Sequence, residues 1–133
     1  MDRKKLLKHL VVLMFFIFIM NLLANGFYWY FSIWYFDIIM HFLGGFWVSL
    51  FFVYVFSMKS GTQWNSLFFF RVLVSALAVG IFWEFYEYFL NIVSVEIFDS
   101  EDTASDVFFD LAGGLCAILY LWIPLEIKKF NIK

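Results

Sequence analysis

Acidic residues recur at helical spacing just before the last apolar run of the chain. Asp102, Asp106 and Asp110 stand at i, i+4 and i+8, which places their carboxylates on one face of a helix. An Asp at the centre of a membrane helix costs about 2.5–3.5 kcal/mol on insertion scales. A chain this apolar has no packing reason to carry such a row. The spacing therefore predicts that polar groups or a ligand meet these carboxylates.

Two further pairs of ionisable residues have the same kind of spacing. Asp37 and His41 stand at i,i+4, and Glu84 and Glu87 stand at i,i+3, so each pair shares one helical stripe. Taken singly, Asp37 also fits a helix cap and His41 a structural buried imidazole. Capping does not explain Asp110, which lies two turns inside the last apolar run. It does not explain Glu84 and Glu87 either, because they lie near the end of the third apolar run, where the helix dipole disfavours acids. Ionisable residues that face the interior of a membrane bundle are candidates for a functional site.

These residue types support two kinds of chemistry, between which the sequence does not choose. Several carboxylates and one imidazole cannot share a pocket while all are charged, so either some are protonated or a cation neutralises them. For general acid/base chemistry, the candidate catalytic residues are His41, Glu84, Asp37 and Asp106. A divalent cation such as Mg, Mn, Ca or Zn has the candidate ligands Asp37, His41, Glu87, Asp106 and Asp110.

The composition is that of a membrane protein. The chain has 133 residues, of which 65% are hydrophobic and 26% aromatic, whereas about 45–50% apolar residues are usual in a soluble domain. At about 20 residues per crossing, the chain holds four helices and little else. We therefore expect an all-α polytopic membrane protein whose single transmembrane domain, residues 1–133, is a bundle of four helices. The one cysteine, Cys116, excludes a disulfide within the chain.

The apolar runs and their borders predict where the helices lie. The expected spans cover residues of about 6–24, 37–56, 66–90 and 106–124. Between them we expect a turn at Asn25-Gly26, an aromatic interfacial segment over 27–36, a short loop over 57–65 and an acidic loop over 91–105. The basic first residues, the short apolar run and Ala24-Asn25-Gly26 also fit a signal peptide. We favour a retained helix because the run approaches spanning length.

The distribution of charge predicts the orientation. With the N-terminus in the cytoplasm, all nine Lys and Arg residues fall on or near the cytoplasmic side, as the positive-inside rule requires. They are Arg3, Lys4, Lys5, Lys8, Lys59, Arg71, Lys128, Lys129 and Lys133. Of the eleven acidic residues, Asp2 and Glu126 alone fall on that side. We expect a multi-pass protein of the bacterial inner (cytoplasmic) membrane with both termini cytoplasmic and the acidic cluster at the outer leaflet.

A short internal repeat links the second and fourth spans. Asp37-x-x-x-His41-Phe-Leu-Gly44-Gly45 matches Asp106-x-x-x-Asp110-Leu-Ala-Gly113-Gly114 position for position. The match predicts two helical hairpins related by a pseudo-twofold axis along the membrane normal. The glycine pairs would let the two helices approach closely one turn below the polar residues.

Three motifs in this order resemble those of a known family. They are Asp37-x-x-x-His41-Phe, Trp83-Glu84-x-x-Glu87 and Asp102-Thr103-x-x-Asp106, with Gly113 downstream. The combination resembles the YjdF-like family of bacterial integral membrane proteins and, more distantly, the VanZ-like family, over about residues 37–114. The chain departs from the pattern in being shorter and in having Asp110 where the pattern can be apolar. The resemblance implies a place in the cell envelope and lipid head groups as the substrate class.

Our leading hypothesis is an enzyme that hydrolyses or transfers the head group of a phospholipid or a polyprenyl-phosphate lipid at the outer leaflet. His41 and Glu84 would act as acid and base, and the remaining carboxylates would orient them or bind a cation. One alternative is a small transporter or sensor that binds a metal or protons, although few polar residues continue toward the cytoplasmic side. Another is an accessory membrane subunit. The expected partners are membrane lipids, with no nucleic acid, and the oligomeric state is left open.

Overall fold

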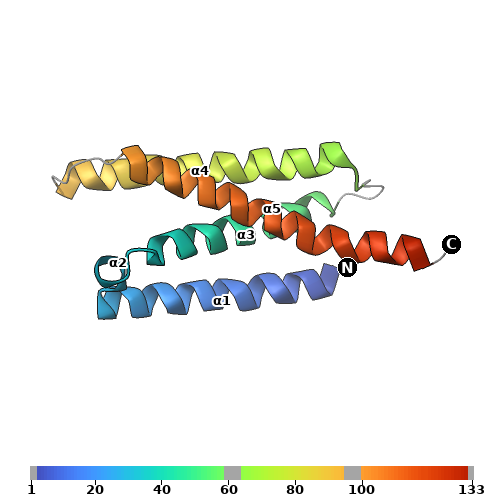
Figure 1. Cartoon of the computed structure of the whole chain (residues 1–133), viewed down its shortest axis with the longest axis horizontal. Helices are drawn as coiled ribbons and strands as arrows, with labels where there is room; N and C mark the ends of the chain where they lie inside the picture. The colour runs from blue at the N-terminus through green and yellow to red at the C-terminus, as the bar shows by residue number, and fades with distance from the viewer. Residues whose placement is uncertain (1–2, 59–63, 95–99, 132–133) are drawn as a thin grey trace.

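The computed structural model describes residues 3–58, 64–94 and 100–131, with side chains to residue 90 in the second range and to residue 123 in the third. These residues are helical almost throughout and contain no strand (Figure 1). The helices are α1 (Arg3–Phe27), α2 (Trp29–Ser32), α3 (Phe36–Phe56), α4 (Ser66–Ser94) and α5 (Ser100–Asn131). The predicted all-α fold is confirmed.

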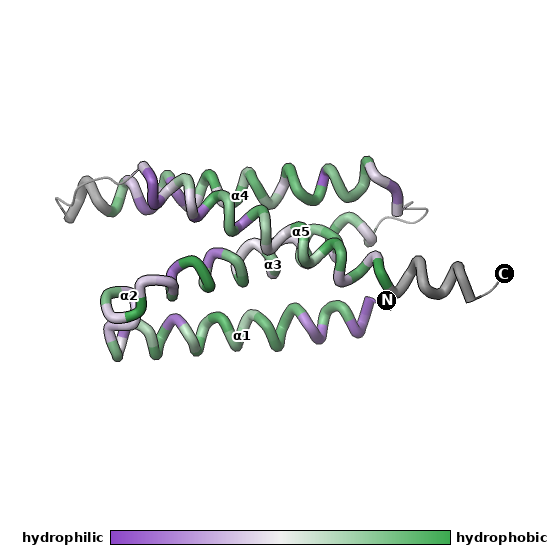
Figure 2. The backbone as a smooth tube through the Cα atoms, viewed as in Figure 1, coloured by the Kyte–Doolittle hydropathy of each residue, from purple (hydrophilic) through white to green (hydrophobic). Residues whose placement is uncertain are grey.

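Four of these helices are long and apolar enough to cross a membrane. The candidate spans are Arg3–Phe27, Phe36–Phe56, Ser66–Leu90 and Ser100–Ile123. Only 11% to 39% of the most apolar window in each span is buried inside the protein, so most apolar side chains point outward. Figure 2 shows hydrophobic residues along the length of these helices and hydrophilic ones mostly toward their ends. An outward-facing apolar surface of this kind suits lipid, and the predicted four-helix membrane bundle is confirmed.

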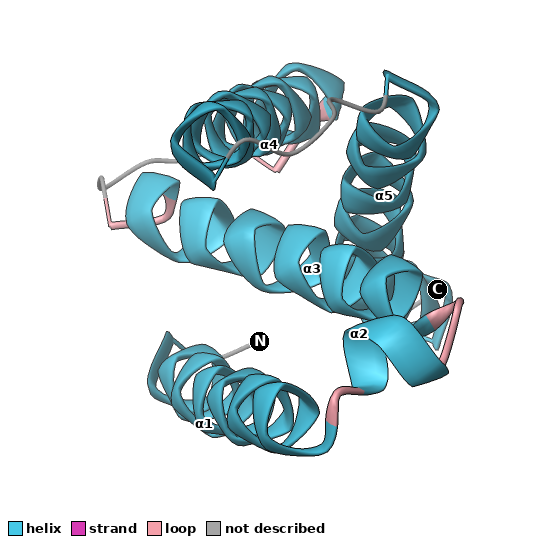
Figure 3. Ribbon diagram, turned by 90° about the vertical axis from the view of Figure 1, so that its left-hand side faces the viewer, coloured by secondary structure: helices cyan, strands magenta, loops and turns pink. Residues whose placement is uncertain are grey.

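The centre of the bundle is α3. The most extensive packing in the structure is between α3 and α5, while α4 packs on both of these helices and α1 packs on α3 (Figure 3). Both termini lie at one end of the bundle, here called the terminal end (Figure 1). The opposite end, called the site end, holds α2 and the beginnings of α3 and α5.

The apolar core lies toward the terminal end. It is built from the first turns of α1 and α4 and the second halves of α3 and α5. Its buried members are Leu6, Leu10, Leu50, Val53, Phe68, Val72, Ala117, Ile118 and Leu121. The ionisable residues singled out from the sequence all lie on the other side of the glycine pairs, toward the site end.

Glycines bring α3 and α5 together between the core and the site end. A Cβ atom on Gly45 would collide with the backbone carbonyl of Asp110, and one on Gly113 would collide with the backbone carbonyl of Phe42. A Cβ on Gly114 would lie 2.6 Å from the Oγ atom of the buried Ser49. The predicted close approach of the two helices at their glycines is confirmed, since any side chain here would force the backbones apart.

The first helix is longer than the sequence suggests. A turn at Asn25-Gly26 was the expectation, yet α1 continues to Phe27 and the chain turns at Tyr28, whose φ is 56°. The Nδ2 atom of Asn25 donates a hydrogen bond to the carbonyl oxygen of Asn21, 2.9 Å away, so the side chain is satisfied along the helix and does not end it. The aromatic segment then forms the short helix α2, none of whose residues is buried.

The expected acidic loop over 91–105 is also largely helical. α4 continues to Ser94 and α5 begins at Ser100, not near Asp106, and continues past Pro124 to Asn131. Glu101 and Asp102 occupy the first turn of α5, where unpaired backbone N–H groups and the helix dipole favour carboxylates. Most of the expected loop, 57–65, and the acidic residues Glu96 and Asp99 lie outside the described residues.

The Lys and Arg residues that the structure describes share one end of the bundle. The basic residues of α1 lie in its first two turns, and Arg71 lies in the second turn of α4, which also starts at the terminal end (Figure 1). Lys59 and Lys133 fall outside the described residues. This grouping agrees with the predicted N-in, C-in threading, although which face of the membrane is cytoplasmic stays a prediction, as does the retained first helix.

The predicted twofold relation between hairpins is met only in part. α3 and α5 run in the same direction and contact each other closely, as the repeat requires. α4, however, packs closely on both of them, whereas α1 packs on α3 and meets α5 through side chains, including the 3.2 Å contact between Nδ1 of His9 and the hydroxyl of Tyr120. The central pair therefore follows the repeat and the outer helices do not.

Candidate metal centre at the site end

The candidate residues come together from three helices. α3 contributes its first two turns, α4 contributes a stretch close to the end of its membrane span, and α5 contributes its second and third turns. His41, Glu84, Asp106 and Asp110 are buried, and Asp106 is only 2% exposed. The helical spacing seen in the sequence thus turns all three stripes toward one point in the bundle.

His41 lies at the centre of the cluster, with a carboxylate at each edge of its ring. On one edge, its Nε2 atom is 3.6 Å from Oδ2 of Asp106 and 3.8 Å from Oδ1 of Asp37. On the other edge, its Nδ1 atom is 3.4 Å from Oδ1 of Asp110, the shortest of the three separations. Both separations on the Nε2 side are too long for a good hydrogen bond. The Nε2 atom therefore faces two carboxylates but lies too far from both for a hydrogen bond of normal length.

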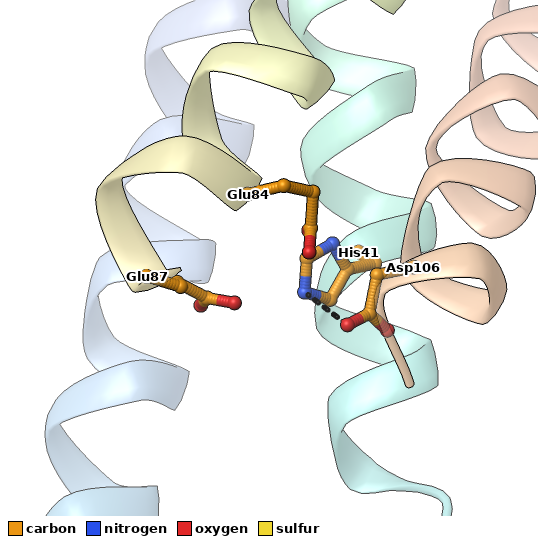
Figure 4. Close-up of side chains that lie close together, drawn as sticks. All are labelled: His41, Glu84, Glu87 and Asp106. Atoms are coloured by element: carbon orange, nitrogen blue, oxygen red, sulfur yellow. Dashed lines mark ion pairs between the residues drawn. The ribbon is translucent and has the colours of Figure 1, made fainter. Parts of the chain in front are cut away.

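Four of these residues have the geometry of ligands to one cation. One ligand atom from each of His41, Glu84, Glu87 and Asp106 can be chosen so that all four lie within 4.8 Å of one another (Figure 4). For a tetrahedral cation with bonds of about 2.0–2.1 Å, neighbouring ligand atoms are about 3.4 Å apart. The 3.6 Å between Nε2 of His41 and Oδ2 of Asp106 is close to this value. A separation that is poor for a hydrogen bond is thus suitable for two ligands of a shared ion.

Glu84 supplies the clearest sign that something is bound. Its side chain points to His41 (Figure 4), and its Oε1 atom is buried with no hydrogen-bond partner among the described residues. The side chain is also bonded by Thr103 of α5, whose hydroxyl donates to it. A carboxylate oxygen that is withdrawn from water and left unpaired is costly, and a cation would remove that cost.

Glu87 is held by a neighbour on its own helix. The Nε1–H group of Trp83 donates a hydrogen bond of 2.8 Å to Oε1 of Glu87, and the indole ring is half-exposed on the surface of α4. Partners of this kind orient ligands in metal sites and are usually needed for full metal affinity. From the sequence, Trp83 and Thr103 stood out only as members of the family motifs.

The two remaining aspartates of the prediction lie at the margins of this group. Asp37 forms a second close set with Asp102 and Asp106, and its side chain is 37% exposed, so this side of the cluster is open to the exterior. Asp110 belongs to neither set of close ligand atoms among the described residues, because it meets the opposite edge of the imidazole.

One nearby residue was not expected from the sequence. The hydroxyl of Tyr30, on α2, donates a hydrogen bond of 2.9 Å to Oδ1 of Asn21 on α1. Burial raises the pKa of Tyr30 above its ordinary value of 10.0, and the nearby Asp37 and Glu87 raise it further. Its hydroxyl therefore stays protonated at neutral pH and can keep tying α2 to α1. Only the aromatic composition of 27–36 pointed to this segment.

Comparison with known proteins identifies the family of the chain. A model for the family described as Predicted membrane protein (DUF2238) matches residues 1–126. No curated protein and no solved structure matches the chain. The match agrees with the expected likeness to YjdF-like membrane proteins, whereas the likeness to VanZ-like proteins stays a prediction. Because the model covers nearly the whole sequence, the chain belongs to this family of predicted membrane proteins.

Proposed function

We propose that this protein holds a divalent cation inside the membrane bundle, between α3, α4 and α5. The ligands are His41, Glu84, Glu87 and Asp106, and the observation that carries the proposal is the buried, unpaired Oε1 atom of Glu84 beside the open Nε2 edge of His41. One imidazole with three carboxylates suits Zn²⁺ or Mn²⁺ better than softer ions.

The test is metal analysis of the protein purified in detergent and equilibrated with Zn²⁺ or Mn²⁺. The parent protein should retain about one ion per chain, and Asp106→Asn should bind at least about 10-fold more weakly, because it removes the ligand that faces Nε2 of His41. Glu101→Gln, which neutralises an exposed acid five residues earlier on the same helix and outside both close sets of ligand atoms, is the matched control and should bind like the parent. A parent protein that binds no ion, or equal affinity in Asp106→Asn, refutes the proposal.

We further propose that the site acts on the phosphate-bearing head group of a phospholipid or polyprenyl-phosphate lipid at the outer leaflet, by hydrolysis or transfer. A bound cation would polarise a phosphoryl oxygen and activate water. The arrangement supports this role because the cluster lies within a few turns of three helix ends and opens on the side of Asp37. Asp37, which is not among the four ligands, is placed to take a proton from water.

Activity is tested separately from metal binding. The metal-loaded protein is incubated with vesicles containing phospholipid or polyprenyl phosphate, and released head groups are measured by mass spectrometry. Asp37→Asn should retain the ion but turn over substrate at least about 100-fold more slowly, because general base catalysis usually contributes a factor of this size. Metal binding without turnover of either lipid class would reject the enzyme and leave a metal sensor or an accessory subunit.

The packing below the site gives less support to a transporter. The backbones of α3 and α5 are in contact at Gly45 and Gly113, directly on the terminal side of His41 and Asp110. Farther along α5, Cys116 is exposed, and the half-exposed Tyr120 places its hydroxyl 3.2 Å from Nδ1 of His9 on α1. The buried Ser49 lies against Gly114, next to this contact.

A further inference from the structure

We infer that Asp110 is a positioning residue for His41 and not a ligand of the cation. It would hold a proton on Nδ1 of the imidazole, so that the lone pair of Nε2 faces the other ligands. This inference rests on the proposed metal centre and assigns a role to the one buried acid that the four-ligand set leaves out.

The first step concerns the edge of the ring that Asp110 meets. Its Oδ1 atom is 3.4 Å from Nδ1 of His41, where it faces any proton on that nitrogen, whereas Asp106 faces Nε2. A neutral imidazole has one N–H and one lone pair, and a partner that accepts from one nitrogen places the lone pair on the other. Carboxylate, histidine and metal in this order are a common arrangement in metalloproteins.

The second step concerns what keeps the carboxylate in place. A Cβ atom on Gly80 of α4 would lie 2.6 Å from Oδ2 of Asp110, and one on Gly44 of α3 would lie 4.0 Å from its Oδ1. The backbone of Asp110 itself contacts Gly45. The side chain therefore lies beside glycines of two other helices, and a larger residue at Gly80 would displace it.

Together these contacts explain the glycines as well as the acid. Gly80 has no counterpart in the internal repeat, yet it lies against the Asp110 carboxylate from the third helix. Replacing either partner should thus disturb the same property, the orientation of His41. A ligand role for Asp110 would instead require its oxygens to approach the other three carboxylates, from which the imidazole separates it.

The test compares Asp110→Asn and Gly80→Ala with the parent and with Gly26→Ala, a glycine whose added Cβ would meet nothing within 4 Å. Binding of Co²⁺ and Zn²⁺ is measured by competition, and the visible absorption of bound Co²⁺ reports the ligand set. We expect about 10–100-fold weaker binding in Asp110→Asn, the usual effect of losing an outer partner, with an unchanged Co²⁺ band. Gly80→Ala should move affinity in the same direction because it displaces the carboxylate while keeping it. Gly26→Ala should match the parent.

A second readout does not depend on metal. In protein labelled with ¹⁵N-histidine, with His9→Gln removing the other imidazole, the Nδ1 proton of His41 should be detected as hydrogen-bonded in the parent and should shift in Asp110→Asn and Gly80→Ala. A changed Co²⁺ band in either variant would make Asp110 a ligand and overturn the inference. Parent-like affinity and Nδ1 resonance in both would overturn it too. Failure of the parent to bind metal would count against the proposed function, while the Nδ1 resonance would still decide the role of Asp110.

Discussion

At the scale of single residues, the site is defined by how three helices share one imidazole. His41 has a carboxylate on each ring edge, and α4 adds the two glutamates that have no equivalent in the α3–α5 repeat. Without a cation, several acids and one imidazole must be accommodated in a largely buried space. A cation held as proposed would instead be met by four of these side chains. The difference between the metal-free and the metal-bound protein can be measured as a change in the melting temperature.

Glu84→Gln should therefore have opposite effects with and without metal. In metal-free protein the substitution removes a charge from a buried oxygen that has no partner, so the melting temperature in detergent should rise above that of the parent. Metal at about 100 times its Kd should stabilise the parent by about 2.7 kcal/mol, and the variant by much less. Differential scanning fluorimetry with and without Zn²⁺ measures both effects. Equal stabilisation of the two proteins by Zn²⁺ would contradict a ligand role for Glu84.

Much of the site could be predicted from spacing alone. Asp37 and His41, Glu84 and Glu87, and Asp106 and Asp110 were each expected on one stripe of a helix, and the structure brings all three stripes together. Spacing does not reveal which ring edge of His41 each carboxylate meets. That depends on how far α3 and α5 slide along each other, which is fixed by glycine contacts between residues distant in the sequence.

At the scale of the helices, the α3–α5 contact is the feature with the least tolerance. A Cβ atom on Gly113 would collide with the carbonyl oxygen of Phe42 and lie 2.8 Å from the backbone nitrogen of Phe46. Backbone atoms cannot move aside as a flexible side chain can, so the helices themselves would have to separate.

Gly113→Ala should therefore destabilise the bundle by about 3 kcal/mol, the upper part of the usual range for overpacking, or by more. Gly26→Ala places the same methyl group on an open surface of α1 and should leave stability unchanged or slightly higher, because alanine favours helix. Thermal or denaturant unfolding in detergent compares the two variants. A Gly113→Ala protein as stable as the parent would show that the two backbones are not in contact.

Helix ends were the least predictable part of the fold. Asn25-Gly26 has the composition of a turn, but the Asn25 side chain bonds to the helix, and the chain turns two residues after Gly26, at Tyr28. The stretch before Asp106 suggested a loop because it gathers acidic residues, yet acids in a first helical turn are stabilised by its backbone N–H groups. Local composition could not distinguish a polar loop from a polar first turn.

At the scale of the whole molecule, the cations and the acidic cluster occupy opposite ends of the bundle. The positive-inside rule then predicts that Arg3 faces the cytoplasm and Ser100 the exterior. In a Cys116→Ser background, an impermeant maleimide should label Ser100→Cys in intact cells, and Arg3→Cys only after permeabilisation. Both positions are exposed, so lack of labelling reports sidedness and not burial. Labelling of both from outside would exclude the three crossings that the predicted threading places between them, and reversed labelling would invert the proposed leaflet of the site.

The position of the apolar core has a further consequence for how the molecule works. Because Leu50, Val53, Val72 and their neighbours lock the helices together near the termini, the other end does not have to supply the cohesion of the fold. It can carry carboxylates that repel one another, because the close α3–α5 contact at Gly45 and Gly113 lies between these groups and the apolar core. We therefore expect any change in helix separation that accompanies binding or loss of a cation to be confined to the site end.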